Sequence, residues 1–289
     1  MVVQRLLPWA VRAAWAVLPL ALGPSLGAAL DPRSRAVQLV AAGGLWAGWA
    51  TALLATLVPS PIALTVARVV APGAGAAAVA AAAEGHGSPL ALGAALAAIV
   101  LLLLPETGQY FVNGASYPNE RRFPLRPPAA VLVLVLPLAW ALCVGGPVAG
   151  SLLLAARQWV AGGVASALAA PLTVVLGRSL HGLSRRWLVF VPAGLVVHDP
   201  IALADPVLFQ RQVIAAFGPA RAGTTALDLT QRAPGLALEL ALTEEVPLVR
   251  TTPGQRGGLP AAPRAVLVTP TRPGAVLREA ASRRLPAGP

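Results

Sequence analysis

The sequence changes character at residues 177–200, GRSLHGLSRRWLVFVPAGLVVHDP. Upstream of this stretch, long runs of Ala, Leu, Val and Gly carry almost no charge. Downstream, short alternating segments are separated by Pro, Gly and paired charges. Apolar runs of about 20 residues are typical of membrane-spanning helices, and alternation over about four to eight residues is typical of strands. The stretch therefore predicts the exit of the chain from a membrane into a small β-rich domain.

The composition of the whole chain agrees with a membrane protein. Of the 289 residues, 56% are hydrophobic and 11% are charged, and the mean hydropathy is +0.71. An ordinary soluble domain has about 25% charged residues. The net charge is +11, and the arginines are spread over both halves of the chain. This spread favours the lipid bilayer and its anionic headgroups as the partner, argues against nucleic acid, and leaves room for a protein partner at the β-rich domain.

The apolar runs predict an α-helical membrane bundle of about six spans. They cover residues 13–30, 36–58, 62–83, 89–104, 129–156 and 159–177. The first run follows Arg5 and Arg12, so a cleaved signal peptide is an alternative to a retained first helix. The third run contains Arg68 and is interrupted by Pro72, so a chain with five spans is also consistent with the sequence.

The distribution of arginines indicates the orientation of the helices. If the amino terminus is cytoplasmic, nine arginines fall on the cytoplasmic side and three on the other side, as the positive-inside rule expects. The cytoplasmic nine are Arg5, Arg12, Arg68, Arg121, Arg122, Arg126, Arg178, Arg185 and Arg186, and the other three are Arg33, Arg35 and Arg157. We therefore expect a multi-pass protein of the cell membrane with its carboxyl-terminal domain in the cytoplasm.

Three glycine pairs have the GxxxG spacing, which lets helix backbones approach closely. They are Gly23 and Gly27, Gly44 and Gly48, and Gly146 and Gly150. The spacing predicts close packing within one bundle, and a dimer face is the alternative.

The polar segment 105–128, PETGQYFVNGASYPNERRFPLRPP, is the longest polar break between the apolar runs. Aromatic rings mixed with arginines suit the headgroup layer of a membrane. We expect this segment to be an interfacial loop, or else a contact site for headgroups or a partner that is formed by Tyr117, Arg121 and Arg122.

The exit from the last apolar run carries three more candidates for headgroup contact. These are Arg178, Arg185 and Arg186. Basic residues near an anionic membrane surface are attracted to it. The alternative is that they only mark the cytoplasmic end of the last helix.

Residues 184–286 predict a β domain with about seven short strands and one closing helix. The strands are expected at residues 187–191, 195–198, 212–217, 224–229, 236–242, 246–251 and 265–269. The Pro-Ala-Gly sequence at 192–194 predicts a turn between the first two. Apolar residues in 275–285 recur at helical spacing, and Pro286 ends the pattern.

This order of elements resembles the membrane-linked bacterial pleckstrin-homology-like domains. The resemblance rests on RRWLVFVPAGLVVHDP at 185–200 and on the closing TPTRPGAVLREAASRRL at 269–285. The whole chain is also similar to a group of uncharacterised multi-pass membrane proteins of actinobacteria, through NERRFPLRPP at 119–128 and SRRWLVFVPAGLVVHDP at 184–200. Phosphoinositide-binding members carry a Lys/Arg cluster in the turn after the first strand, where this chain has Pro-Ala-Gly. The resemblance therefore implies the fold but not inositol-lipid binding.

No group of residues in the sequence forms a recognisable catalytic, cofactor or metal site. The histidines His86, His181 and His198 lie far apart and lack the spacing of zinc ligands. Ser179, His181 and Asp199 have the residue types of a hydrolytic triad, but no nucleophile-elbow motif accompanies them. We therefore predict no enzyme activity, no cofactor and no metal.

The leading hypothesis is a non-enzymatic integral membrane protein that acts as a scaffold or adaptor through its cytoplasmic β domain. The alternative is a transporter of small molecules or lipids, with Arg68 facing an anionic substrate. None of the expected spans contains Asp or Glu, which weakens this alternative because ion-coupled transport usually needs such groups. An enzyme that acts on lipids would have to use Glu106, Glu120 or Asp205.

Overall fold

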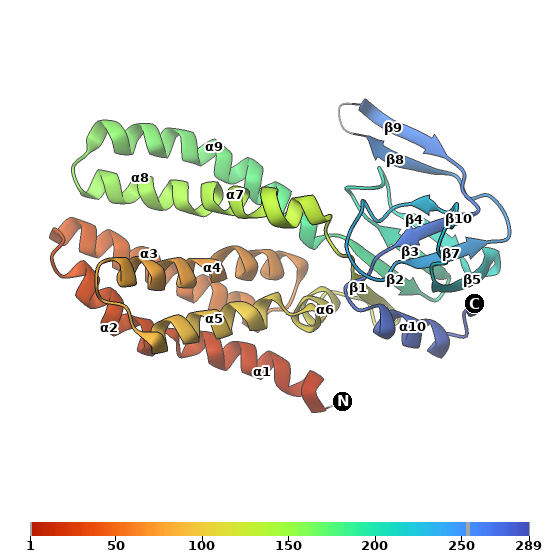
Figure 1. The fold of residues 1–289 in the computed structure, drawn as a ribbon, viewed down its shortest axis with the longest axis horizontal. Coiled ribbons are helices and arrows are strands. Elements are labelled where there is room, and N and C mark those ends of the chain that lie inside the picture. The colour runs from red at the N-terminus through yellow and green to blue at the C-terminus, as the bar shows by residue number, and fades with distance from the viewer. Residues whose placement is uncertain (1, 253–254, 289) are drawn as a thin grey trace. The chain divides into compact units, whose positions relative to one another are not determined.

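The computed structural model describes residues 2–252 and 255–288 and divides into two compact units (Figure 1). Met1–Gly114 and Leu136–His181 form a helical unit. Ala115–Val135 and Gly182–Pro289 form a second unit, called the β unit because it contains the strands. The β unit therefore includes a segment from the middle of the chain, which the expected domain at 184–286 does not contain.

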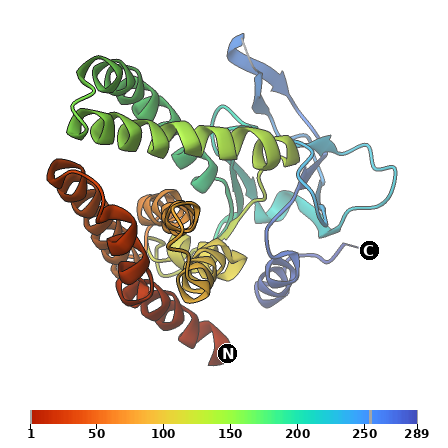
Figure 2. The same cartoon turned by 60° about the vertical axis from the view of Figure 1, so that its left-hand side comes forward.

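Long apolar helices make up the helical unit, and Figure 2 shows them packed side by side. The bounds are α1 (Val2–Ala16), α2 (Leu18–Leu30), α3 (Arg35–Leu57), α4 (Pro61–Ala83), α5 (Pro89–Leu103), α6 (Pro105–Asn113), α8 (Gly146–Ala155) and α9 (Trp159–Ser184). A short α7 (Leu136–Trp140) lies between two π-helical turns, η1 (Val131–Val135), which is the last part of the middle segment of the β unit, and η2 (Ala141–Gly145) of the helical unit.

Among the described residues, five helical segments are long and apolar enough to cross a membrane, and a bent pair makes a sixth if it counts as one span. The five are Leu6–Leu30, Arg35–Leu57, Pro61–Ala83, Val131–Ala155 and Trp159–Ser184. The bent pair is α5 and α6, with an angle of 56° between them. The third expected span is thus a helix of 23 residues. The fourth expected span is the irregular one. Its helix α5 has 15 residues, and at about 1.5 Å per residue it is shorter than the roughly 30 Å of hydrocarbon.

Serine caps fix where three of the helices begin. The Oγ atoms of Ser34, Ser60 and Ser88 each accept a hydrogen bond from the backbone N–H three residues later, at the starts of α3, α4 and α5. Proline follows the serine in α4 and α5, at a position where its missing N–H removes no helical hydrogen bond. These caps explain why the chain can reverse between apolar helices through short turns.

Two tryptophans join α1 to α3 through a reciprocal pair of hydrogen bonds. Trp49 Nε1 donates to Trp15 O at 3.0 Å, and Trp15 Nε1 donates to Trp49 O at 2.8 Å. Pro19 lies four residues after Trp15 and has no N–H for that carbonyl, so the Trp49 indole supplies the missing donor. The proline is tolerated inside an apolar bundle because a neighbouring helix satisfies the freed backbone group.

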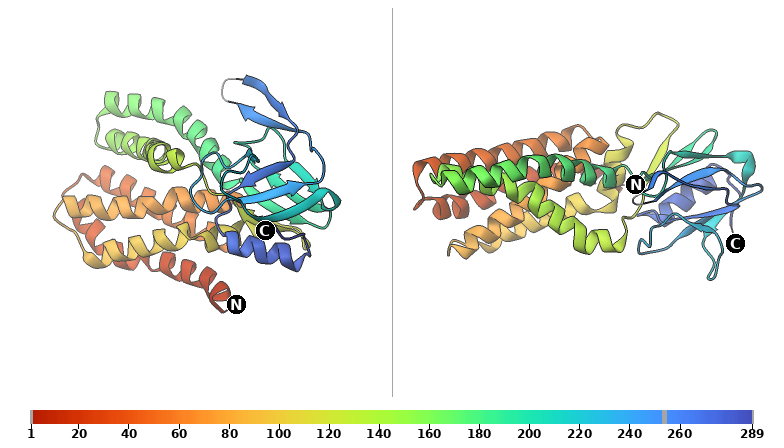
Figure 3. Two further views of the ribbon diagram at one scale, coloured as in Figure 1. Left: turned by 45° about the vertical axis from the view of Figure 1, so that its right-hand side comes forward. Right: turned by 90° about the horizontal axis from the view of Figure 1, so that it is seen from above.

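The last two long helices form an antiparallel hairpin (Figure 3). Thr173 Oγ1 donates to Cys143 O at 3.1 Å, which is the carbonyl that Pro147 leaves without a helical donor. A Cβ on Gly150 would lie 2.5 Å from Ser166 Oγ and 3.1 Å from its backbone nitrogen. The third glycine pair therefore serves close packing between neighbouring helices, as its spacing predicts.

The described residues of the β unit form two four-stranded sheets and a two-stranded ribbon. The first sheet has the order β1-β2-β3-β4, formed by Arg121–Pro124, Trp187–Val191, Gly194–His198 and Val207–Gln210. The second has the order β5-β7-β10-β6, formed by Ile214–Pro219, Leu238–Leu242, Ala265–Val268 and Leu227–Asp228. The ribbon consists of β8 (Leu248–Thr252) and β9 (Gln255–Ala261), and the other elements are the 3-10 turn η3 (Arg211–Val213) and the helix α10 (Pro273–Ser282).

Strand β1 comes from the segment that was expected to be an interfacial loop. It pairs antiparallel with β2, and Phe123 lies opposite Leu188. The side chains of Phe123 and Leu125 are 3% and 5% exposed and belong to the hydrophobic core of the β unit. The expectation of a loop is therefore wrong for this part of 105–128, because its apolar side chains complete a buried sheet.

Elsewhere in the β unit the seven expected strands correspond to β2, β3, β5, β6, β7, β8 and β10 with changed bounds, whereas β4 and β9 were not expected. The expected turn at 192–194 connects β2 to β3, and the expected closing helix corresponds to α10. The expected strand at 224–229 shrinks to the two residues of β6. Side chains hold turns on both sides of it, because Thr224 Oγ1 accepts from Ala226 N and Asp228 Oδ1 accepts from Thr230 N.

Candidate membrane-surface contacts

Four of the six candidate contact residues have exposed side chains. Tyr117 is 74% exposed, and it lies in the β unit with the exposed Arg121 and Arg185. Arg178 is exposed on α9. Within the part of the chain that the structure describes, these three guanidinium groups make no hydrogen bond or ion pair. Their charges are therefore available to an external partner.

Arg122 is half-buried and holds the edge strand in place. Its Nη2 atom lies 2.9 Å from Glu120 Oε2. Its guanidinium lies 5.5 Å from the ring centroid of Trp187, and that ring stacks on His198 with 4.9 Å between centroids. Arg122 thus joins β1 to β2 by a cation–π contact in addition to the backbone pairing. We therefore assign it to the packing of the sheet and not to the contact set.

Arg186, expected at the headgroups, is buried inside the β unit. Its side chain is 1% exposed, and Nε and Nη2 each donate to the Asp199 carboxylate at 2.7 Å. Its Nη1 donates to Arg126 O at 2.9 Å, and Asp199 Oδ1 also accepts from Ile201 N at 3.1 Å. The expectation of headgroup contact is wrong for Arg186, because a buried guanidinium in a bidentate ion pair does not reach a headgroup.

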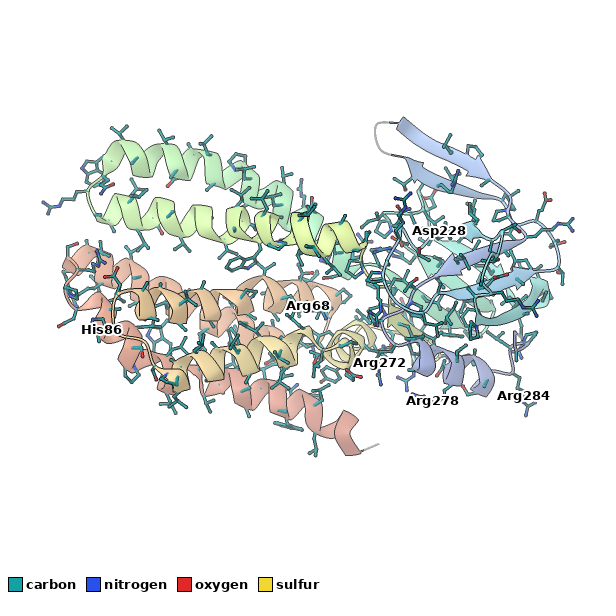
Figure 4. The ribbon with its side chains drawn as sticks, in the orientation of Figure 1. Arg68, His86, Asp228, Arg272, Arg278 and Arg284 are labelled. Atoms are coloured by element: carbon teal, nitrogen blue, oxygen red, sulfur yellow. The ribbon has the colours of Figure 1, made fainter. Side chains whose placement is uncertain are left out.

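The break between α5 and α6 leaves two backbone carbonyls that need donors inside the helical unit. Pro105 has no N–H for Leu101 O, and Thr107 Oγ1 donates to that oxygen at 2.6 Å. Arg68 of α4, labelled in Figure 4, donates from Nε to Leu102 O at 3.4 Å. The bend is therefore stabilised by one side chain from its own helix and by one from a neighbouring helix.

This geometry gives Arg68 a structural role. A Cβ on Gly108 of α6 would lie 2.9 Å from Arg68 Nη2, so the glycine lets α6 approach the guanidinium. The transporter alternative required Arg68 to face an anionic substrate. The guanidinium instead contacts the broken helix pair, which favours a cap over a substrate site.

The described residues contain no group of three or more His, Cys, Asp or Glu side chains that could hold a metal ion. His181 Nδ1 lies 2.9 Å from Thr65 Oγ1. The Thr65 hydroxyl donates its single proton to Pro61 O at 3.0 Å, so the imidazole is the donor in this pair. His181 therefore joins α9 to α4.

The carboxylates considered for lipid chemistry have different surroundings. Glu120 is paired with Arg122, and Asp205 is exposed in the β unit. Glu106 lies in the first turn of α6, where a negative charge is favoured by the helix dipole. Glu120 is thus held in the sheet edge and Asp205 is solvated, and neither supports the lipid-enzyme alternative.

The ion pair of Arg186 and Asp199 has a signal in the sequence. In the hairpin of β2 and β3, Trp187 lies opposite His198, so the residues just outside this pair are also opposite each other. Opposite charges at such positions attract.

Comparison of the chain with protein-family models, curated proteins and solved structures finds no match.

Proposed function

We propose that the chain is a non-enzymatic integral membrane protein in which the helical unit anchors the β unit at the cytoplasmic surface of the cell membrane, where the β unit acts as a scaffold or adaptor. The pairing of β1 with β2 supports this most directly. The helical segments Val131–Ala155 and Trp159–Ser184 separate these strands in the sequence. Because both strands lie in one sheet, the chain must enter and leave this helical pair on the same side of any membrane that it crosses.

Both helical segments have the length and the surface of membrane spans. Their 25 and 26 residues correspond to about 37 and 39 Å at about 1.5 Å per residue, against roughly 30 Å of hydrocarbon. Large apolar side chains remain exposed on them, including Leu134 (70%), Val160 (83%) and Leu168 (62%). Such surfaces are unfavourable in water and are solvated by lipid tails. The exposed apolar faces therefore support insertion as a membrane hairpin.

Short connections would keep the β unit close to the membrane surface. Residues 125–130 join β1 to the first helical segment, and Arg185 and Arg186 join α9 to β2. An extended chain covers at most about 3.6 Å per residue, so six residues reach about 20 Å. We infer that Tyr117, Arg121 and Arg185, with Arg178 of α9, contact anionic headgroups, to which each arginine contributes about 1 kcal/mol.

Cysteine labelling tests the proposed topology. In a Cys143→Ala background, we expect the variants Tyr117→Cys and Arg157→Cys to react with a membrane-impermeant maleimide from opposite sides of the membrane. The reason is that one helical segment separates the two exposed positions. The mass shift of the labelled protein, measured in spheroplasts and in inverted vesicles, reports the side. Reaction of both positions from the same side would contradict the proposed crossing.

A second experiment tests the headgroup contacts. We expect the triple replacement of Arg121, Arg178 and Arg185 by Gln to weaken the attraction of the region around Tyr117 to anionic lipid. A fluorophore is attached to Tyr117→Cys, and its quenching by a lipid-borne quencher is measured. Two kinds of nanodisc are compared over a salt series, one of neutral lipid and one of neutral and anionic lipid. In the parent protein, quenching should rise with anionic lipid and fall with salt.

The matched control removes the same charge from exposed arginines elsewhere in the β unit. Arg221, Arg232 and Arg278 are exposed, and their replacement by Gln lowers the net charge by the same amount. We expect this control to retain most of the quenching. Equal loss in both triple variants would show that only net charge matters, and it would count against the proposed contact set.

A further inference from the structure

Strand β5 lies at one edge of the second sheet, and residues 286–288 cover that edge. In the sheet order β5-β7-β10-β6 of the described residues, β5 has a neighbouring strand on one side only. On its other side, Phe217 N donates to Pro286 O at 2.9 Å, and Gly288 N donates to Phe217 O at 2.9 Å. Ala287 forms a parallel bridge with Phe217. Residues 286–288, called the covering segment, therefore lie on β5 as an added parallel strand.

The covering segment makes few contacts that would prevent its release. Among the described residues, the two backbone hydrogen bonds to Phe217 hold it on β5. The side chains of Pro286 and Ala287 are exposed, so they bury little apolar surface. A peptide hydrogen bond makes a modest net contribution, because both groups can bond to water instead. Leu285 is 9% exposed and belongs to the hydrophobic core, so the chain stays anchored there when the segment leaves β5.

Two glycines in close contact limit which strand can take this place. A Cβ on Gly288 would lie 3.0 Å from Gly218 N and 3.1 Å from Gly218 Cα, which is closer than nearly all Cβ contacts in proteins. A strand that replaces the covering segment therefore needs glycine at this position. Two residues earlier it needs only a carbonyl, because Phe217 N is the donor there, so proline is allowed.

Exposed arginines flank β5 at both ends. Arg211 lies just before the strand and Arg221 just after it. Arg211 Nη2 donates to Arg284 O at 3.0 Å, and neither flanking arginine takes part in an ion pair among the described residues. The β unit as a whole contains fifteen arginines against eight acidic residues. This charge favours an acidic strand at the edge.

We propose that the free side of β5 is a binding site for an extended, acidic segment of a protein partner, and that the covering segment occupies the site until the partner binds. Strand addition to a sheet edge is a common mode of peptide recognition, in which main-chain hydrogen bonds give affinity and side-chain size gives specificity. The partner segment lies parallel to β5, forms both hydrogen bonds to Phe217 and places glycine beside Gly218. The site rests on the proposed adaptor role and gives the partner a chemical class.

Hydrogen exchange of the full chain in nanodiscs of neutral lipid tests whether the covering segment protects the edge. Gly288→Val should displace the segment and speed exchange of the Phe217 amide by at least about tenfold. The matched control Ala287→Val changes an exposed side chain of the same segment and should leave this exchange within about twofold. A chain that ends at Leu285 opens the edge in a second way. Exchange in β7, measured in the same samples, shows that the β unit stays folded.

The probe for the site is a synthetic peptide in which two glutamates stand on each side of Pro-Ala-Gly. When the edge is open, the peptide should slow exchange at Phe217, with half of the effect at about 1 mM or below, since a short connection gives the covering segment an effective concentration of millimolar order. The parent protein should need at least about tenfold more peptide, because its covering segment competes. Peptides with valine in place of glycine, or lysines in place of the glutamates, should bind at least about tenfold more weakly.

The other outcomes would overturn the proposal. No slowing by the glutamate peptide in either opened chain would show that the edge does not accept a separate strand. Equal effects of the glycine and valine peptides, or of the glutamate and lysine peptides, would contradict the stated chemistry of the partner. Unchanged exchange at Phe217 in both opened chains would show that the covering segment does not protect the edge. The cysteine-labelling result does not depend on β5, so failure of this site is distinguishable from failure of the proposed function.

Discussion

Replacement of Asp199 by alanine is expected to lower the free energy of unfolding of the β unit by about 3–5 kcal/mol, enough to unfold it in many conditions. The change leaves Arg186 charged and 1% exposed, with both of its carboxylate contacts removed. A buried charge without a partner is costly because the protein interior does not replace its hydration. Chemical unfolding of the full chain in detergent, followed by near-ultraviolet circular dichroism, measures the loss.

Two further variants show whether the ion pair causes this effect. Asp205→Ala removes an exposed carboxylate of the same unit and should change the free energy of unfolding by less than about 0.5 kcal/mol. The double variant Arg186→Met with Asp199→Leu removes both charges and should recover most of the lost stability. If Asp199→Ala unfolds at the same denaturant concentration as the parent protein, the buried pair does not stabilise the fold.

Gly194→Ala is expected to have the second large effect, a loss of about 2–5 kcal/mol from the free energy of unfolding of the β unit. Gly194 begins β3 and has φ +151°, a conformation that residues with a Cβ rarely adopt. The Cβ of an alanine would also overlap Phe209 O of the neighbouring strand β4. The backbone of one of the two strands would have to move, so the first sheet should lose its pairing at this end.

Gly223→Ala is the matched control for the backbone conformation. Gly223 has φ +76°, and no atom lies within 4 Å of the position of its Cβ. We expect it to cost about 1 kcal/mol through backbone strain alone. Thermal unfolding of both variants in the same detergent compares the two effects, and equal midpoints would show that contact with β4 does not matter at Gly194.

The apolar helices and the local strands could be predicted from the sequence because their signals lie within short windows. The long runs mark the helices, and the turn at 192–194 marks the hairpin of β2 and β3. Strand β1 was not predicted, although Phe123 and Leu125 are two apolar residues at strand spacing between Arg122 and Arg126 in NERRFPLRPP. That strand has only four residues and ends in Pro124, and its partner lies beyond two long helices. Pairing over such a distance leaves no local signal.

The candidate contacts were harder to predict than the fold. Under the positive-inside rule every arginine counts equally, because only its position relative to the apolar runs matters. The structure separates them by burial, with Arg185 exposed and the adjacent Arg186 enclosed in an ion pair. The partner of Arg186 follows from the register of the hairpin, in which positions 186 and 199 are opposite. Charge alone could not distinguish these neighbours, whereas strand register does.

The order in which the ribosome makes the strands has a consequence for quality control. Strand β1 leaves the ribosome before the helical pair, and its partner β2 follows that pair. If the proposed crossing holds, a chain that inserts only one of the two helices leaves β1 and β2 in different compartments. The apolar side chains of Phe123 and Leu188 then stay uncovered, and unpaired strands are targets for proteases and chaperones. In that case, the first sheet forms only in chains that have inserted both helices of the pair.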